Sequence, residues 1–458
     1  MTNCVIPLRP GVPAAALLIL VILDAGRAGE RIDIDTVWAG HPVGFALLTS
    51  PPHQFAAYYD AERRMTVAQR TLDEKTWRYT RLPSQLGWDS HNRVIMAIDK
   101  SGRLHVAGNM HCVPLVYFRS EKAWDAASLV KIDTMVDPQK EQRVTYPVFM
   151  HRTDGRLVFR YRNGRSGSGD DLYNIYDETV QSWKPLVAVP VTSGEGKMNA
   201  YCSTPSLGPD GLYHMVWVWR DTPDCATNHD LSYARSRDLE HWETAGGTAL
   251  ELPIKLHSGA VVDSAPAGGG LINGGFALGF DRSRRPVISY SKYDSHGNTQ
   301  VYVARFQDGN WMIRQVSDWS DYRWDFHGGG SIDFEVRVGT VRSGRDGQMQ
   351  LNCNYPRGNV EWILDENSLE PVAAPVAPSA PKPSQPRPQT APQAAKREPS
   401  GDDSPSFPGL GLKTAGDSGS GGTNVRYQLR WHTLGPNRDR PRTGPLPPPS
   451  TLQLEIID

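Results

Sequence analysis

Apolar and polar residues alternate in short runs along most of the chain, and Gly, Asp and Pro bound these runs. Such alternation puts every second side chain on one face of an extended strand. No long stretch shows the i, i+3, i+4, i+7 apolar spacing of an amphipathic helix. The pattern therefore predicts an all-β protein.

Two phrases recur along the chain and interleave. The first is an aromatic-rich run and a polar turn that end in a tryptophan, at Trp77, Trp124, Trp183, Trp242 and Trp311. The second is an Asp-led turn that opens an apolar strand, at Asp99, Asp154, Asp210, Asp281 and Asp346. A period of roughly fifty residues with several strands per unit is typical of a propeller blade. With a weaker first unit and a composite closing unit, the repeats predict a seven-bladed β-propeller of four-stranded antiparallel blades, and six blades are the alternative.

The composition of the chain changes at both ends. Residues 1–28 combine a basic start, an apolar run and small residues, which is typical of a cleaved secretory signal peptide. An uncleaved anchor is the alternative. Residues 29–370 carry the repeats and form the expected catalytic propeller, whereas the Pro-, Gly- and Ser-rich residues 371–424 are expected to be disordered. Residues 425–458 regain strand alternation and are expected to close the ring beside the first strand.

Charge and cysteine content narrow the possible functions. Lys and Arg number 49 and Asp and Glu number 50, so no overall charge recruits nucleic acid or a membrane. Thirteen Trp and seventeen Tyr are compatible with sugar binding. Four cysteines remain after the leader, which is too few for a disulfide framework in so long a chain. We expect a secreted, periplasmic or extracellular monomer that acts on a glycan.

Polar residues flank the repeated strands at positions that blade topology brings to one end, near the central axis. They are His91, Asn92, His111, Tyr146, Arg162, Tyr201, Arg220, Lys292 and Tyr293. No carboxylate pair occupies equivalent positions, which argues against the usual glycosidase arrangement. A serine-nucleophile motif and a phosphate-binding glycine loop are also missing from the sequence.

Cationic groups together with a tyrosine suit an acidic substrate and a β-elimination. The carboxylate of a uronic acid must be neutralised before its C5 proton becomes removable, and Arg and His provide that stabilisation. A Tyr or His within reach can then transfer protons at C5 and at the leaving oxygen. A Tyr base requires a lowered pKa, which neighbouring Arg and protonated His favour. Each residue alone has a structural explanation, such as a loop hydrogen bond for His91, and only their coincidence supports chemistry.

The phrases WDSHNRVIMAIDKSGRLHVAGNMHCVPLVYF and RVTYPVFMHRTDGRLVFRYRNGRSGSGDDLYNIYD resemble the BNR-repeat polysaccharide lyases, which include ulvan lyases and L-rhamnose-α-1,4-D-glucuronate lyases. The resemblance covers most of residues 35–370 and implies a seven-bladed propeller that cleaves next to a uronate. It implies that His91 and Tyr146 are acid/base candidates. It also implies that His111, Arg162 and Arg220 bind the carboxylate. Which of His91, His111 and Tyr146 is the base stays open.

Two alternatives to a lyase remain. A related branch hydrolyses the rhamnose–glucuronate bond with a histidine in an N-terminal segment, where this chain has His41. A carbohydrate-binding propeller without catalysis is the other alternative.

The chemistry requires no cofactor, although the resemblance implies a structural zinc or calcium ion. Cys225 and His229, joined by His327, are the candidate zinc ligands. Asp170 and Asp171 are a weaker candidate for calcium.

Overall fold

Strands make up nearly all regular structure in the computed structural model, which describes residues 30–372, 407–419 and 425–457. Within these residues the helices are two single 3-10 turns, η1 (Ala126–Ser128) and η2 (Cys225–Thr227). The all-β prediction is confirmed. The predicted signal peptide lies outside the described residues, and no helix among the described ones is long and apolar enough to cross a membrane.

The described strands form five hydrogen-bonded sheets. The first contains β1 (Arg31–Val37), β33 (Ser450–Ile457), β32 (Arg426–Leu434) and β31 (Leu410–Gly416). The second contains β2 (Ala46–Ser50), β3 (His53–Tyr59), β4 (Arg64–Thr71) and β5 (Arg78–Gln85). The third contains β6 (Val94–Ile98), β7 (Leu104–Gly108), β9 (Tyr117–Ser120) and β10 (Leu129–Lys131).

The two remaining sheets are larger. One contains β8 (His111–Val113), β11 (Val144–His151), β12 (Leu157–Arg165), β13 (Ser168–Asp177), β14 (Ser182–Pro185), β15 (Thr192–Ser193), β16 (Asn199–Cys202), β17 (Ser206–Leu207), β18 (Tyr213–Arg220), β19 (Asn228–Ser236), β20 (Trp242–Glu243), β21 (Ala249–Leu250) and β22 (Val261–Asp263). The other contains β23 (Phe276–Phe280), β24 (Pro286–Tyr293), β25 (Thr299–Gln307), β26 (Asn310–Gln315), β27 (Arg337–Val338), β28 (Arg342–Ser343), β29 (Gln348–Tyr355) and β30 (Gly358–Asp365).

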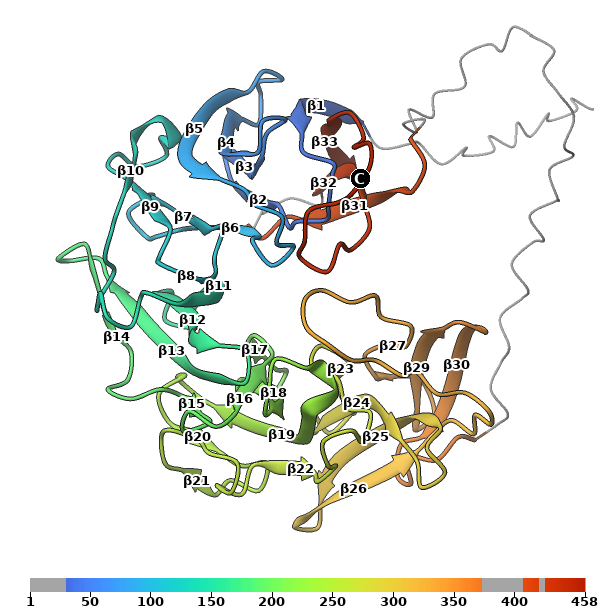
Figure 1. Ribbon diagram of the computed structural model, residues 1–458. Coiled ribbons are helices and arrows are strands. Elements are labelled where there is room, and N and C mark those ends of the chain that lie inside the picture. The colour runs from blue at the N-terminus through green and yellow to red at the C-terminus, as the bar shows by residue number, and fades with distance from the viewer. Residues whose placement is uncertain (1–29, 373–406, 420–424, 458) are drawn as a thin grey trace, which may run out of the picture.

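Each larger sheet divides into two antiparallel groups at a single parallel pair. Gly169 of β13 pairs with Asn199 of β16, and Phe280 of β23 pairs with Arg342 of β28. The groups follow one another in chain order around a common centre, and the first strand lies beside the last ones (Figure 1). This arrangement brings strand ends and loops from distant parts of the sequence together.

The Asp-led phrase folds as a turn whose carboxylate satisfies backbone donors. Oδ1 of Asp99 accepts hydrogen bonds from the backbone N–H groups of Ser101 and Arg103, each at 2.9 Å. Gly102 between them has φ +80°, which a residue without Cβ adopts at little cost. Oδ1 of Asp281 accepts the N–H of Arg285 at 2.8 Å in the same way. The repeated Asp therefore marks the start of a hairpin.

The repeated tryptophans pack between strands. Trp77, Trp183 and Trp242 are buried in separate apolar clusters. The indole N–H of Trp183 donates to the buried hydroxyl of Tyr117 at 3.0 Å, so its polar atom is also satisfied. These side chains stabilise the fold and line neither cavity described below.

The C-terminal residues form strands beside the first one. β33 pairs antiparallel with β1 on one side and with β32 on the other. The predicted disorder over 371–424 is wrong for Leu410–Gly416, which form β31 at the free edge of this sheet. Its side chains are mostly exposed, which is why its composition suggested disorder. Residues 373–406 and 420–424 lie outside the described part.

Candidate active site

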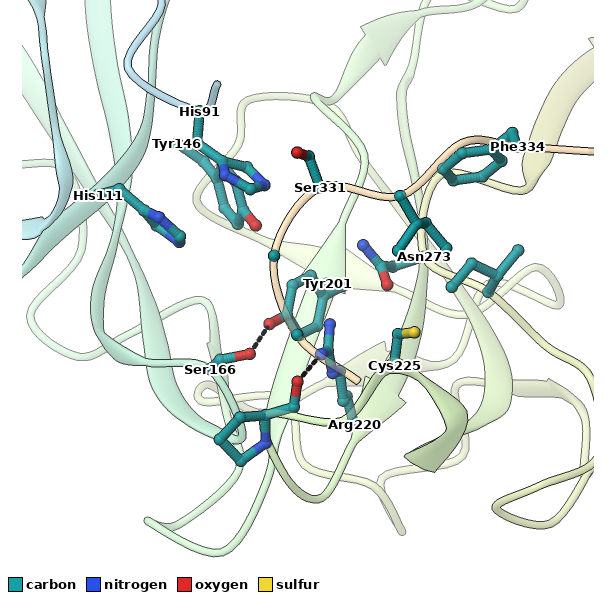
Figure 2. A pocket seen from close by; sticks show the side chains of 15 residues that line it. His91, His111, Tyr146, Ser166, Tyr201, Arg220, Cys225, Asn273, Ser331 and Phe334 are labelled. Atoms are coloured by element: carbon teal, nitrogen blue, oxygen red, sulfur yellow. Dashed lines mark hydrogen bonds between the residues drawn. The ribbon is translucent and has the colours of Figure 1, made fainter. Parts of the chain in front are cut away.

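Two adjoining cavities lie among the loops and strand ends that carry the predicted residues. The first, of about 270 Å³, is lined in part by His91, His111, Tyr146, Ser166, Tyr201 and Arg220. The second, of about 390 Å³, shares His91, Tyr146 and Tyr201 and adds Arg93, Arg160 and Arg162. In the first cavity, the two histidines and Tyr146 gather on one side and face Tyr201 and Ser166 (Figure 2). Five of the predicted residues are thus brought together there, and Arg162 lies in the adjoining cavity.

A β-bulge positions Tyr146. The register between β11 and β12 shifts between Thr145 and Val148, and Tyr146 has φ +54°. A bulky residue rarely adopts this left-handed conformation, and bulges commonly re-aim a side chain next to a functional site. The phenol ring consequently lies 5.7 Å from the His91 ring and 6.0 Å from the His111 ring, centroid to centroid.

One carboxylate links the two histidines. Oδ1 of Asp89 lies 2.8 Å from Nδ1 of His91 and also accepts the backbone N–H of His91 at 2.8 Å. Its Oδ2 accepts a short hydrogen bond from Nδ1 of His111. The two imidazole rings lie 4.3 Å apart, centroid to centroid. A hydrogen bond at Nδ1 leaves Nε2 of each ring available for substrate.

A second carboxylate comes from the loop between β32 and β33. Oδ2 of Asp439 lies 3.3 Å from Nδ1 of His91, and it accepts the backbone N–H of Ser331 at 2.8 Å. Oδ1 accepts the backbone N–H of Ser90 at 3.0 Å. His91 therefore lies between two acidic groups from opposite ends of the sequence.

The charge state of His91 follows from this environment. Burial disfavours the imidazolium, but hydrogen bonds and negative charge from Asp439 and Asp89 outweigh it and raise the pKa of His91 to about 9. Burial also opposes ionisation of Asp89, yet the hydrogen bonds from His111 and His91 keep its pKa well below the usual range. His91 is thus cationic at neutral pH. This charge state suits the neutralisation of a carboxylate, whereas the resemblance suggested an acid/base role.

Tyr146 is a neutral phenol at neutral pH. Burial raises its pKa above the ordinary value, and neighbouring Tyr201 adds to this effect. Arg162 and Arg220 act in the opposite direction without overcoming it. The expectation of a lowered pKa at Tyr146 is therefore wrong, because removal from water outweighs the nearby positive charge. In this state the hydroxyl is suited to donate a proton.

Arg162 is buried with few partners. Its guanidinium carbon lies 4.9 Å from the centre of the Tyr146 ring, and only 4% of the residue is exposed. Its Nη atoms make long contacts of 3.4 Å with the Tyr201 hydroxyl and with Sγ of Cys112, and Nε has no hydrogen-bond partner. None of the described carboxylates forms an ion pair with it. A buried cation without a counter-charge indicates a place for an anion.

Two further arginines face the cavities. Arg220 is buried and lies 5.1 Å from the Tyr201 ring centre, while its Nε donates to the carbonyl oxygens of Thr222 and Asp224 at 3.0 and 3.2 Å. Arg93 donates from Nη2 to the Pro147 carbonyl at 3.2 Å, and its buried Nε has no partner. Neither has a carboxylate partner among the described residues, so the cavities present positive charge.

Asp89, His91 and His111 also offer three metal-ligand atoms within 4.8 Å of one another. Ligand atoms around a tetrahedral zinc ion with bonds of about 2.0 Å lie roughly 3.3 Å apart. The 2.8 Å separation between Asp89 and His91 is shorter and matches a hydrogen bond. We therefore treat this group as a hydrogen-bonded network.

The predicted zinc ligands do not come together. Cys225, His229 and His327 form no ligand group among the described residues. Both ring nitrogens of His229 are occupied, since Nδ1 lies 2.7 Å from Asp230 and Nε2 lies 3.1 Å from Asp221. Cys225 lines the first cavity instead. The structure therefore does not bring the three predicted zinc ligands together.

The weaker calcium candidate is also engaged elsewhere. Both oxygens of Asp171 lie 2.9 Å from Nε of Arg160, within a buried ion pair. Asp170 precedes it on β13, so its side chain points to the opposite face of the strand. The two carboxylates do not converge.

Three predicted substrate-binding residues lie outside both cavities. Asn92 is buried, and its carbonyl accepts the Tyr59 hydroxyl at 2.5 Å. Lys292 forms an ion pair of 2.6 Å with Asp263, and the hydroxyl of Tyr293 donates to the carbonyl of Trp324 at 2.7 Å. Lys292 and Tyr293 end the repeated strand β24, as predicted, but these contacts engage their side chains.

His41 lies outside the site as well. The indole N–H of Trp38 donates to Nδ1 of His41 at 2.9 Å, and His41 also packs against Trp88. The residue has no exposed surface, and burial lowers its pKa to about 4. A catalytic residue of a hydrolase must reach its substrate, so the observation that favoured hydrolysis has a structural explanation.

Sequence reasoning missed Asp89, Asp439 and Arg93. Asp89 and Arg93 flank His91 by two residues on either side, so the same phrase contained a usable signal. Asp439 lies outside the two repeated phrases, and the fold brings it to His91.

A protein-family model described as "BNR repeat-containing family member" matches residues 53–319. No curated protein matches the sequence. Among solved structures, the polysaccharide lyase Uly1 matches with TM-score 0.61 and 14% identity, over 94% of this chain and 99% of that chain. A PL25 ulvan lyase matches with TM-score 0.54 and 12% identity, over 89% of this chain and 97% of that chain. The ulvan lyase bound to -[GlcA(1-4)Rha3S]- matches with TM-score 0.50 and 13% identity, over 75% and 86%. At these identities the likeness concerns the fold.

Proposed function

The chain belongs to the BNR repeat-containing family, and from this membership and the charged cavities we propose that it is a polysaccharide lyase. We propose that it cleaves a glycan containing rhamnose and a uronic acid, by β-elimination next to the uronate. One observation carries the proposal most: two histidines linked by Asp89 face Tyr146, beside a buried Arg162 that forms no ion pair with a described carboxylate.

In this proposal the cations bind the uronate carboxylate. Charged His91 and the donors of Arg162 neutralise it, and Arg220 adds positive charge across the cavity. Neutralisation makes the C5 proton more acidic because the negative charge that develops on the carboxylate in the transition state is stabilised. The absence of an ion-pair partner for Arg162 means that the substrate need not displace one.

Two further residues transfer protons. Nδ1 of His111 donates to Asp89, which leaves the Nε2 lone pair to remove the C5 proton. The C5–H electron pair then forms the C4–C5 double bond, and the bond from C4 to the leaving oxygen breaks. That oxygen takes the proton of the Tyr146 hydroxyl, which is neutral before reaction. Water returns the proton to Tyr146 and takes one from His111, so no net proton change occurs on the enzyme.

The direct test uses ulvan and a gum arabic-type glycan, each incubated with the protein. Elimination produces an unsaturated uronate whose conjugated double bond absorbs ultraviolet light, together with products of unchanged total mass. Products that each gain water without the absorbance would indicate hydrolysis. Binding without any product would indicate a carbohydrate-binding propeller.

We also infer that the antiparallel groups are the blades of a seven-bladed propeller. Three sheets are one group each, and the two larger sheets divide at their single parallel pairs into two groups each. The likeness to the fold of Uly1 supports this count. A crystal structure with six blades would contradict it.

Finally, we propose export of a monomer with residues 1–28 removed. The leader pattern and the polymeric substrate, which is too large to enter a cell, both support it. Mass spectrometry of the mature protein from culture medium and light scattering in solution test the two parts separately.

A further inference from the structure

The loop that follows β32 reaches from the C-terminal strands to the wall of the active site. Nδ2 of Asn437 donates to the Trp88 carbonyl at 2.7 Å, and the Ser90 hydroxyl donates to Oδ1 of Asn437 at 3.0 Å. On the other side, Nη1 of Arg438 donates to the His327 carbonyl at 3.3 Å. The loop is thus hydrogen-bonded to the segment that carries His91 and to the segment that carries Ser331. Ser331 lines the first cavity.

Asp439 contacts both of these segments and His91 itself. Its two oxygens accept the backbone N–H groups of Ser90 and Ser331 at 3.0 and 2.8 Å, and the second oxygen lies 3.3 Å from Nδ1 of His91. Arg438 and Asp439 have φ of +54° and +58°. Two successive residues with side chains rarely adopt this left-handed backbone, and it persists where the surrounding contacts require it.

The charges of the histidine pair require a second carboxylate. The rings of His91 and His111 lie 4.3 Å apart, and Asp89 contacts both. A single negative charge shared by two imidazoles cannot balance both when His111 takes a proton from the substrate. Asp439, whose side chain is only 11% exposed, is the other negative group at His91.

We propose that Asp439 is a positioning residue of the active site, which supplies a second carboxylate to Nδ1 of His91 and so holds the imidazolium with Nε2 toward the substrate. The kinetic readout rests on the proposed lyase function, but the effect on His91 itself does not. The loop thereby makes the C-terminal segment part of the active site.

The effect has a defined direction in pH. The titratable groups that face His91 are Asp89 on its own loop, Asp439 on the C-terminal loop, His111 on β8 and Tyr146 on β11. The carboxylates raise the pKa of His91 to about 9, so removal of one of them lowers it. The imidazolium is then lost at a lower pH, and the alkaline limb of the activity profile moves toward neutrality.

The experiment uses the full-length protein and four variants in the same loop. Asp439→Asn keeps the shape and removes the charge, and Asp439→Glu restores the charge. Arg440→Ala is the matched control, because its side chain is exposed. Asn437→Ala loosens the loop without removing a charge, and it therefore reports a purely structural effect.

Two measurements are made on each variant. The first is the titration of His91 by NMR of histidine-labelled protein, with His91→Gln used for assignment. For Asp439→Asn we expect His91 to titrate at a lower pH than in the wild type, with a midpoint at a proton concentration at least tenfold higher. For Asp439→Glu we expect a midpoint closer to that of the wild type. The second is the pH profile of kcat, in which the alkaline limb of Asp439→Asn moves by the same amount.

The outcomes separate the two proposals. An unchanged His91 midpoint in folded Asp439→Asn, or an equal shift in Asn437→Ala, would overturn the role of Asp439. A shifted midpoint in a protein that forms no unsaturated product would retain that role and refute the lyase function.

Discussion

Replacement of Asp89 by asparagine tests the network at its centre. The change keeps the size of the side chain but removes the charge that Nδ1 of both histidines contacts. The rise of the His91 pKa from 6.5 to about 9 corresponds to about 3 kcal/mol of folding free energy. Since Asp89 and Asp439 share this effect, we assign about half, ~1.5 kcal/mol, to Asp89. The lost charged hydrogen bond to His111 adds about 1.5 kcal/mol.

The pH dependence distinguishes these two parts. A raised pKa contributes its full stability below the unfolded value and loses it as pH rises through the folded value. Asp89→Asn should therefore lose about 3 kcal/mol at about pH 6 and only about half of that at about pH 10. Asp89 itself is ionised at both values because its folded pKa is lowered.

Urea unfolding at the two pH values, followed by tryptophan fluorescence, measures both losses. Asp133→Asn is the control, because that carboxylate is 82% exposed and its pairing with Lys131 contributes little. The same loss at both pH values, or a loss no larger than that of the control, would refute the electrostatic reasoning.

Three other substitutions test separate parts of the structure. Tyr146→Phe removes the hydroxyl that donates a proton to the leaving oxygen, so kcat should fall by roughly 10²–10⁴-fold. Binding of the polymer, measured by calorimetry, should persist. An unchanged kcat would exclude Tyr146 as the acid. Arg162→Met should lower kcat/KM by about 10²–10³-fold on the free uronate polymer and by less on its methyl ester, because the ester has no charge to neutralise. An equal loss on both polymers would argue for a packing role. Trp183→Ala should lower the free energy of unfolding in urea by about 3–5 kcal/mol, with little change in kcat, because the side chain is buried away from both cavities. A loss of kcat without a loss of stability would contradict this prediction.

The repeats made the fold predictable from the sequence. Strand alternation and the Asp-led turns are local features, and Asp99 and Asp281 each accept backbone donors of their own turn. The exposed strand β31 was not predictable, because its pairing with β32 depends on a neighbour and not on its own apolar pattern.

The site was predictable only where it follows the repeat. His91, His111, Tyr146 and Arg162 lie near the ends of repeated strands or in the loops that enter them, which is why topology alone brought them together. Side-chain direction was not predictable: Lys292 occupies a similar strand end and is paired with Asp263 instead.

The electrostatics could not be derived from residue types. The pKa of Tyr146 is raised because burial outweighs its arginine neighbours, and burial is a property of the whole fold. Asp439 reaches His91 from a position 348 residues later in the chain, and residue types alone do not predict this contact.

The pairing of β1 with β33 has a consequence for the time at which the protein becomes active. Arg31 and Glu455, which interact across this pair, are 424 residues apart. Contacts over such a separation form late in folding, because a long loop must close first. The ribosome must therefore finish the chain before the last strand can dock and bring Asp439 to His91. A nascent or C-terminally clipped molecule can hold both histidines and Asp89 and still lack the second carboxylate at His91.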